Sequence, residues 1–479
     1  MRIFLTGATG FIGRALVLRL RRDGHEVVAW VRTDSRRALL GAEVELLPVS
    51  AGDVELTRAL ERSDGIVNLA GSPIIGRWTA KTRRAVVTSR VDLTERLIRA
   101  LAAASRRPPV MISGSAIGYY GDRGNEVLTE ESPPGAGFLA SVTTRWEAAA
   151  RRAESLGLRV MTIRTGVVLG REGGMLDRLL PIFRVGLGGP IGSGMQIVSW
   201  IHLNDVVSVI AAALEDERYT GPLNLTAPNP VTNRELASAL GRALGRPARL
   251  RVPGTIVRLA LGEAASALLT GQHVTPARLV SLGYRHEFPR LEEALADIVA
   301  PRAEIVGLAG GTTRPSAVGS PYLAEHRPKF VLEATTMLDA PPEEAFAFFS
   351  HPDNLGLVTP SKLGLELRGA PPTMSAGASM DVRLRVGGLP LRWSTRIEDW
   401  QPGRRFIDAQ LRGPYRAWWH EHIFRPEGGH TIMVDRVFYS LPLGILGRVV
   451  HRLFVAPSLR RIFGFRRDAV RLRFGGVTP

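Results

Sequence analysis

The chain has 479 residues, of which 45% are hydrophobic and 22% charged, a composition typical of a globular protein with two or three domains. It contains no cysteine, which excludes disulfides, cysteine-ligated metals and thiol nucleophiles. The net charge is +17, but only three of the 62 basic residues are lysines, and the arginines are spread along the chain. We attribute the charge to an arginine bias and expect no nucleic-acid partner.

Two further classes are disfavoured by the distribution of apolar residues. The first residues carry no charged leader followed by a long apolar run, and no stretch of about 18 apolar residues occurs. We therefore expect neither a signal peptide nor a transmembrane helix, and we expect a cytoplasmic protein.

Residues 1–230 alternate short β-branched runs with longer amphipathic segments. The runs are RIFLTG, HEVVAWVR, GIVNLAG, PVMISGS and LRVMTIRTGVVLG. Such alternation predicts βαβ units, and hence an α/β, Rossmann-like domain with a doubly wound parallel sheet. Residues 231–300 are mostly helical in pattern and are predicted to form a small helical substrate lobe attached to that domain.

The last third of the chain has a different pattern. Residues 301–328 are rich in glycine, proline, serine and threonine without periodicity, which predicts a linker. Residues 329–479 then read as a strand, a helix, five strands and a long basic amphipathic helix over about 444–473. This order predicts an α+β domain in which an antiparallel sheet wraps around the final helix.

A glycine motif follows the first predicted strand. Gly7, Gly10 and Gly13 have the spacing GxxGxxG and stand where a helix begins, with Thr9 and the pair Phe11-Ile12 between them. Glycines permit a tight turn and a close backbone approach, and the helix N-terminus offers N–H groups to a pyrophosphate. The motif predicts a dinucleotide site.

The end of the second strand indicates which dinucleotide is preferred. NAD sites usually place an acidic residue there, whereas this chain has Arg32 followed by Thr33. A guanidinium binds a 2′-phosphate through two hydrogen bonds, which favours NADP(H), while Asp34 keeps NAD(H) as the alternative. Farther along the chain, we expect the adenosine side of the cofactor to lie near Asp53, Ala70 and Gly71.

Several longer motifs resemble one family. They are TGATGFIG, SGSAIGYYG, RWEAAA, RTGVVLGREGGML, GLGGPIGSGMQIVSWIHLNDVV and ALGEAASALLTGQHVTPARLVSLGY. Through them residues 1–300 resemble an extended short-chain dehydrogenase/reductase of the NAD(P)-dependent epimerase/dehydratase type, in the epimerase-family branch with a small helical C-terminal appendage. The resemblance implies that Ser115 matches the catalytic serine and that Arg77 and Glu147 contact the cofactor.

The usual catalytic dyad of that superfamily is missing from the sequence. Its tyrosine acts as general acid/base beside a lysine four residues later. None of Lys81, Lys329 and Lys362 has a tyrosine four residues before it, and Phe138 and Val142 stand at the expected places.

Three interpretations follow, and whether the protein is an enzyme stays open. In the first, Tyr119 or Tyr120 acts as the acid in an NADP(H)-dependent oxidoreductase or epimerase-like protein. Ser115 then polarises the substrate oxygen, and Glu147 or an arginine replaces the lysine. In the second, the domain is an NADP(H) sensor with little turnover. In the third, these residues are structural.

Residues farther along are candidates for the substrate lobe. Trp200 and His202 stand where that lobe begins, although His202 and Asp205 equally fit the cap of the following helix. Arg164 is placed to meet an anionic substrate. No cluster of histidine and acidic residues has metal-ligand spacing along the sequence, so we predict no metal.

Residues 329–479 resemble the START-like, polyketide cyclase/lipid-transport superfamily with its helix-grip fold. The resemblance implies an apolar cavity and a small apolar ligand or substrate. In AWWHEHIF, strand alternation puts Trp418, His420 and His422 on one face, either to contact that ligand or to pack in the core. The arginine-rich final helix is either gripped by the sheet or in peripheral contact with a membrane.

Overall fold

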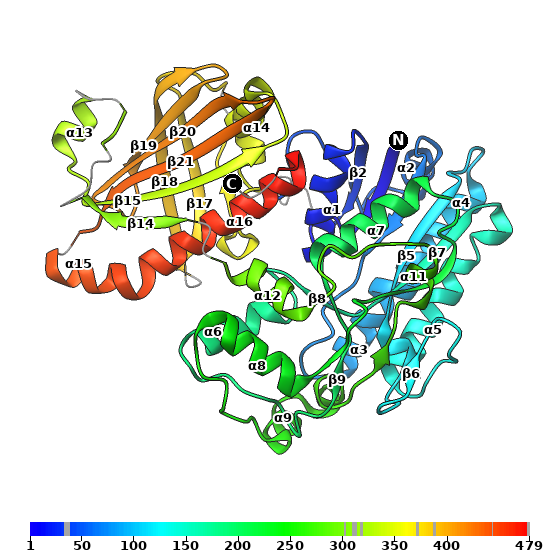
Figure 1. Cartoon of the computed structure of the whole chain (residues 1–479). Coiled ribbons are helices and arrows are strands. Elements are labelled where there is room, and N and C mark those ends of the chain that lie inside the picture. Colours follow the sequence, from blue (N-terminus) through cyan, green and yellow to red (C-terminus); the bar gives the residue numbers. More distant parts are fainter. Residues whose placement is uncertain are drawn as a thin grey trace. The chain divides into compact units, whose positions relative to one another are not determined.

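The computed structural model divides into two compact units, one formed by residues 1–34 and 44–300 and the other by residues 35–43 and 301–479 (Figure 1). It describes residues 1–32, 39–300, 303–308, 314–316, 320–369, 373–386, 389–442 and 444–476. The first unit is α/β and the second is built on an antiparallel sheet, so the predicted fold class is confirmed. Residues 231–300, the predicted helical lobe, lie in the first unit.

The first unit is built on a seven-stranded parallel sheet in the order β11-β7-β5-β4-β1-β2-β3. Its strands are β1 (Arg2–Thr6), β2 (Glu26–Val31), β3 (Glu45–Pro48), β4 (Gly65–Asn68), β5 (Val110–Ala116), β7 (Arg159–Thr165) and β11 (Gly221–Leu225). The order of connection reverses between β1 and β4. Ligands of open α/β sheets bind at such a switch point, outside the carboxyl ends of the strands.

Helices cover both faces of this sheet (Figure 1). They include α1 (Phe11–Arg22), α2 (Asp53–Glu61), α3 (Ala80–Val87), α4 (Leu93–Ala103), α5 (Phe138–Arg151) and α7 (Leu203–Glu215), and a π-helical turn, η2 (Thr88–Asp92), joins α3 to α4. Apolar residues of α2, α4 and α5 pack on one face of the strands, and α1 packs against α7. The strands are buried on both sides, which explains their near-continuous apolar runs.

The lobe after β11 is helical, as its periodicity predicts. Its elements are α8 (Asn233–Leu244), α9 (Gly254–Leu261), η5 (Gly262–Ala265), α10 (Ser266–Leu269), α11 (Ala277–Ser281) and α12 (Leu291–Val299). Helix α8 begins with a capping box, in which Thr232 and Glu235 each satisfy the other's backbone N–H. Its apolar face packs with α12 and with α6 (Leu176–Arg184) in one core cluster.

The second unit has an eight-stranded antiparallel sheet in the order β14-β15-β21-β20-β19-β18-β17-β16. Its strands are β14 (Glu304–Gly307), β15 (Phe330–Leu338), β16 (Glu366–Leu367), β17 (Ser379–Val386), β18 (Leu389–Gln401), β19 (Arg405–Arg412), β20 (Ala417–Glu427) and β21 (His430–Ser440). The final helical stretch runs through α15 (Gly444–Val450), a π-helical turn η9 (His451–Val455) and α16 (Ala456–Phe474). Leu459 and Phe463 of α16 pack against Leu332, Trp418 and Tyr439 of the sheet.

The predicted linker contributes structure to this unit, which corrects the prediction. Strand β14 pairs with β15, and α13 (Pro321–Glu325) buries Tyr322 beside Trp419 on the other face of the sheet from α16. The hydroxyl of Tyr322 accepts a hydrogen bond from the backbone N–H of Trp418 at 3.0 Å. These elements are four and five residues long, too short to produce a periodic pattern.

In the parts of the chain that the structure describes, no helix is both long enough and apolar enough to span a bilayer.

Candidate functional site

The turn between β1 and α1 depends on its glycines. Gly7 has a φ of +71°, and a Cβ built on it would lie 2.6 Å from the carbonyl oxygen of Leu69. A Cβ on Gly13 would lie 2.2 Å from the carbonyl oxygen of Gly7. Side chains at either position are therefore excluded, and the β1 and β4 ends approach each other closely at the switch point.

The N-terminus of α1 is open to an anion. Gly10 is exposed at the N-cap and α1 has neither a side-chain cap nor an acidic residue in its first turn. The intervening residues Thr9, Phe11 and Ile12 are half-buried, and Phe11 packs under the glycines of the segment 170–174. This arrangement of glycines and free helix N–H groups is the one that cradles a pyrophosphate.

A buried network of hydroxyl and amide groups fixes the loop after β4. The Thr6 hydroxyl donates to the Asn68 side-chain oxygen at 2.7 Å and accepts from the backbone N–H of Ala70 at 3.0 Å. Asn68 in turn donates to the Thr94 hydroxyl at 2.8 Å. Because these bonds join β1, β4 and α4, they hold Ala70 and Gly71 beside the glycine turn.

Arg90 lies at the same place and is a residue that the sequence reasoning missed. A Cβ on Gly71 would lie 2.8 Å from its guanidinium, which also stacks on Trp146 at 5.4 Å. Burial lowers the pKa of Arg90 to about 10, and no described contact pairs it with a carboxylate. Its signal in the sequence is an arginine in helical register with Val86, Thr94 and Leu97, which form the buried face of this helical stretch.

The remaining predicted cofactor residues are more exposed. Arg32 lies exposed directly after β2, and Thr33 lies outside the described residues. Asp53 begins α2 and pairs with Arg96 at 2.8 Å. Arg77 is exposed in the segment before α3, near Gly262 of the helical lobe.

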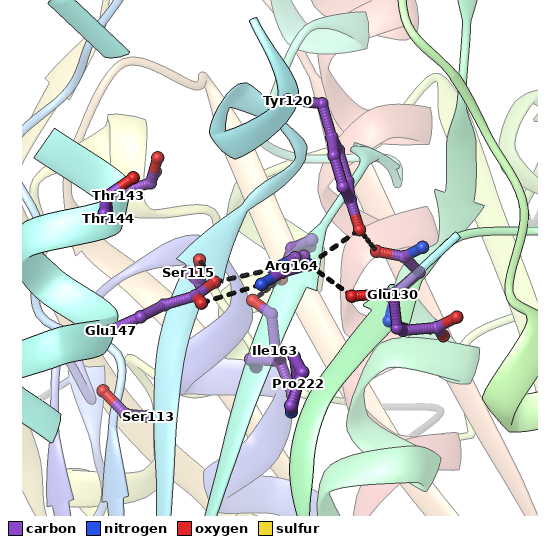
Figure 2. Close-up of polar contacts among 12 residues, drawn as sticks. Ser113, Ser115, Tyr120, Glu130, Thr143, Thr144, Glu147, Ile163, Arg164 and Pro222 are labelled. Carbon is purple, nitrogen blue, oxygen red and sulfur yellow. Dashed lines mark hydrogen bonds and ion pairs between the residues drawn. The ribbon is translucent and has the colours of Figure 1, made fainter. Parts of the chain in front are cut away.

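Ser115, Glu147 and Arg164 form one buried group (Figure 2). Ser115 and Arg164 are register partners on β5 and β7, and Glu147 comes from α5. The Ser115 hydroxyl donates to Glu147 Oε1 at 2.6 Å, and Arg164 binds both carboxylate oxygens, at 2.8 and 3.0 Å. Burial alone would lower the pKa of Arg164, but its bonds with Glu147 outweigh that cost and raise it.

The two candidate tyrosines have different surroundings. Tyr120 is fully buried, and its hydroxyl donates to Asn224 at 2.6 Å and accepts from Arg164 at 3.0 Å. Burial raises its pKa. The half-buried Tyr119 presents its ring face to the Arg164 guanidinium at 3.6 Å. These contacts favour a structural role for Tyr120 and leave Tyr119 as the more accessible ring.

The start of α5 is aromatic where the superfamily has its acid/base pair. Phe138 is the first residue of α5 and packs edge-on against Trp78 at 5.1 Å, with Arg83 over its ring at 4.9 Å. Val142, one turn later, is buried. The helix therefore presents neither a phenol nor an ammonium at this point, and the Trp78–Phe138–Arg83 cluster was not anticipated from the sequence.

The predicted substrate residues of the lobe are engaged in the core. Trp200 is fully buried and its indole N–H donates to the carbonyl of Asn229 at 2.9 Å. His202 caps α7, since its Nδ1 accepts from the N–H of Asn204 at 3.2 Å, and its ring lies on Phe288 at 4.0 Å. These contacts match the capping alternative stated above.

In the second unit, Trp418 packs in an aromatic cluster with Trp393 and Tyr415. His420 is buried on the same face of β20 with His422, and Asp408 of β19 lies close to both. The three side chains form a group with the separations of metal ligands, contrary to the predicted absence of such a cluster. Spacing along the chain missed it because Asp408 comes from the neighbouring strand.

The strand order, the glycine turn and the open helix N-terminus define the first unit as a dinucleotide-type α/β domain. The family described as NAD dependent epimerase/dehydratase matches residues 3–225, and a domain of unknown function, DUF1731, matches residues 252–298. The chain belongs to the epimerase family represented by the SDR39U1 proteins.

Individual relatives cover this part of the chain almost from end to end. "Epimerase family protein SDR39U1 homolog, chloroplastic" of Arabidopsis thaliana is 40% identical over 62% of this chain and 87% of its own length. The mouse protein SDR39U1 is 40% identical over 63% of this chain and all of its own. The crystal structure of human SDR39U1 (isoform 2) with NADPH is 37% identical, with a TM-score of 0.56 over 62% of this chain and 99% of that one.

Proposed function

We propose that residues 1–300 bind NADP(H) at the switch point between β1 and β4 and act as an NADP(H)-dependent oxidoreductase or epimerase-like enzyme. The observation that carries the proposal is the glycine turn, where Cβ atoms at Gly7 and Gly13 would collide with backbone and the start of α1 is uncapped. The human relative crystallised with NADPH supports the same cofactor. The substrate is a carbonyl or hydroxyl compound, expected to be apolar.

The residues around the turn fit this group. The pyrophosphate is held by the N–H groups at the start of α1, and Arg32 at the end of β2 pairs with the 2′-phosphate. Arg90, beside Gly71, adds a second guanidinium to the site. An anionic cofactor compensates the charge of Arg90, for which the described contacts provide no carboxylate.

Bound NADP(H) supplies or accepts a hydride, and the chain's own residues handle the proton. Because the Ser115 hydroxyl donates to Glu147, its oxygen is left to accept a hydrogen bond from a substrate hydroxyl. As the hydroxyl is oxidised, its proton passes to the Ser115 oxygen while the proton of Ser115 passes to Glu147. Arg164 holds Glu147 in place through both carboxylate oxygens, so the relay replaces the missing tyrosine and lysine.

The second candidate function is a cofactor sensor with little turnover. It is favoured by the apolar start of α5, where Phe138 and Val142 replace the acid/base pair. It is also favoured by the two-point clamp of Arg164 on Glu147, which opposes protonation of that carboxylate.

One experiment separates the two. NADPH is titrated into the full chain by fluorescence, and its oxidation is followed with a panel of ketones and quinones. Ser115→Ala should keep cofactor affinity and abolish turnover in an enzyme, while Gly254→Ala, where an added Cβ meets only ordinary contacts, should change neither. Tight binding without turnover by the natural protein indicates the sensor. Failure to bind either coenzyme overturns both, and a preference for NADH overturns the role given to Arg32.

For the second unit we propose a START-like helix-grip domain that binds a small apolar ligand. Support comes from its antiparallel sheet with α16 packed along one face through Leu459 and Phe463. Native mass spectrometry of the freshly purified full chain should detect a retained apolar molecule. The proposal would be contradicted if the native mass equalled that of the polypeptide alone and organic solvent extracted no ligand from the protein.

A further inference from the structure

Three adjacent strands of the second unit bring two histidines and two aspartates to one buried face. Asp408 of β19 is the register partner of His420 on β20, and Asp435 of β21 is the register partner of His422. Side chains directly opposite each other in an antiparallel pair point to the same face. His420 and His422 are each 5% exposed and Asp435 is 4% exposed, so the group lies in the interior of the unit.

The distances on the Asp408 side of this group suit a metal ion better than hydrogen bonds. Asp408 Oδ2 lies 3.5 Å from His420 Nδ1 and 3.6 Å from His422 Nε2. All three ligand atoms lie within 4.8 Å of one another. Good N–H···O bonds measure about 2.7–3.2 Å. By contrast, ligands at about 2.0–2.1 Å from a tetrahedral ion are separated by about 3.4 Å.

The opposite ring nitrogens both lie close to a single carboxylate. Asp435 Oδ1 accepts a hydrogen bond from His420 Nε2 at 3.1 Å and lies 2.9 Å from His422 Nδ1. The same oxygen accepts from Arg466 at 2.9 Å, which fixes its position. A histidine that ligates a metal typically gives its other N–H to a carboxylate, which sets the tautomer and turns the free nitrogen toward the ion.

We propose that Asp408, His420 and His422 bind one divalent transition-metal ion of the zinc class, with Asp435 and Arg466 orienting the two imidazoles. Two histidines and one carboxylate are a ligand set that leaves a fourth position for water or a ligand. Phe406 stacks on His422 at 4.1 Å and Phe463 lies edge-on to His420 at 5.6 Å, so aromatic rings flank the site. The site is independent of the cofactor proposed for the first unit.

The test uses the full chain without an affinity tag, stripped with a chelator and titrated with Zn²⁺ alone by calorimetry. We expect one equivalent of Zn²⁺ per chain. Co²⁺ should give the intense visible bands of a four-coordinate ion. His422→Ala and Asp408→Ala should abolish stoichiometric binding, and Asp435→Asn should weaken it about 10- to 100-fold.

Two controls separate loss of the site from non-specific zinc binding and from misfolding. His430→Ala removes an exposed histidine of the same sheet, paired with Asp339 at 2.8 Å, and should bind Zn²⁺ like the natural chain. If the site variants fail to fold, the Co²⁺ spectrum of the natural chain still shows whether a four-coordinate site is present. The proposal is overturned if the natural chain binds less than one equivalent, if Co²⁺ gives only weak octahedral bands, or if folded His422→Ala binds zinc unchanged.

Discussion

Glu147 and Arg164 form an ion pair in the interior of the first unit, with exposed side-chain fractions of 2% and 4%. Removing one partner of such a pair leaves the other as an uncompensated buried charge, which costs far more than losing a surface pair. Glu147 also accepts a hydrogen bond from the Ser115 hydroxyl, and Arg164 donates one to the Tyr120 hydroxyl. Stability and the proposed proton relay therefore depend on the same few atoms.

Glu147→Gln should lower the free energy of unfolding of the first unit by about 3–5 kcal/mol, because the Arg164 guanidinium loses its countercharge. Urea unfolding followed by circular dichroism measures the change. The matched control is Asp216→Asn, which weakens the exposed pair with Arg218 and should leave the free energy of unfolding nearly unchanged, because solvent screens that pair. A loss below 1 kcal/mol for Glu147→Gln would show that the pair contributes little.

Arg90→Met should have opposite effects on stability and on binding. Since burial lowers the pKa of Arg90 to about 10, the folded chain bears a cost for that charge at neutral pH. Removing it should raise the free energy of unfolding by about 1 kcal/mol without cofactor, while the Kd for NADPH rises about tenfold or more. Thermal unfolding and a fluorescence titration measure the two effects. An unchanged Kd would remove Arg90 from the site.

At the scale of elements, the β1–α1 turn is the most constrained connection in the first unit. Gly13→Ala places a methyl group 2.2 Å from the Gly7 carbonyl oxygen, so α1 must shift away from β1. We expect NADPH binding to fall at least about 100-fold, since the N–H groups of the helix no longer meet the pyrophosphate. Calorimetric titration measures it, and Gly254→Ala, at the start of α9, is the control. Retained affinity in Gly13→Ala would place the cofactor elsewhere.

The elements with strong local patterns were predictable from the sequence, and those that depend on distant contacts were not. Five of the seven parallel strands, the glycine turn and the six main strands of the second unit follow from apolar runs and alternation, whereas the edge strands β3 and β11 were not predicted. The ion pair of Arg164, the position of Arg90 beside Gly71 and the approach of Asp408 to two histidines join residues that are far apart or on different strands. A short element such as β14 forms because the edge of β15 is available for pairing. Its four residues are too few to show a periodic pattern in the sequence.

At the scale of the whole molecule, the chain holds two units, each with its own buried core. Calorimetric unfolding of the full chain should therefore show two transitions. NADPH at about 100 times its Kd should stabilise the transition of the first unit by about 2.7 kcal/mol and leave the second unchanged. If NADPH changed neither transition temperature, NADPH binding to the first unit would be contradicted. A single shared transition would show that the two units unfold together.

The segment that reads as a linker has a practical consequence for expressing the second unit alone. A recombinant fragment that starts at residue 329 leaves β15, an apolar strand of nine residues, as an unprotected sheet edge. It also removes the backbone N–H of Ser316, which donates a hydrogen bond of 2.7 Å to Glu421. Glu421 has no exposure to water, so water cannot replace this donor. Exposed strand edges recruit other chains, so such a fragment should aggregate, and one that starts at residue 303 should stay monomeric in light scattering.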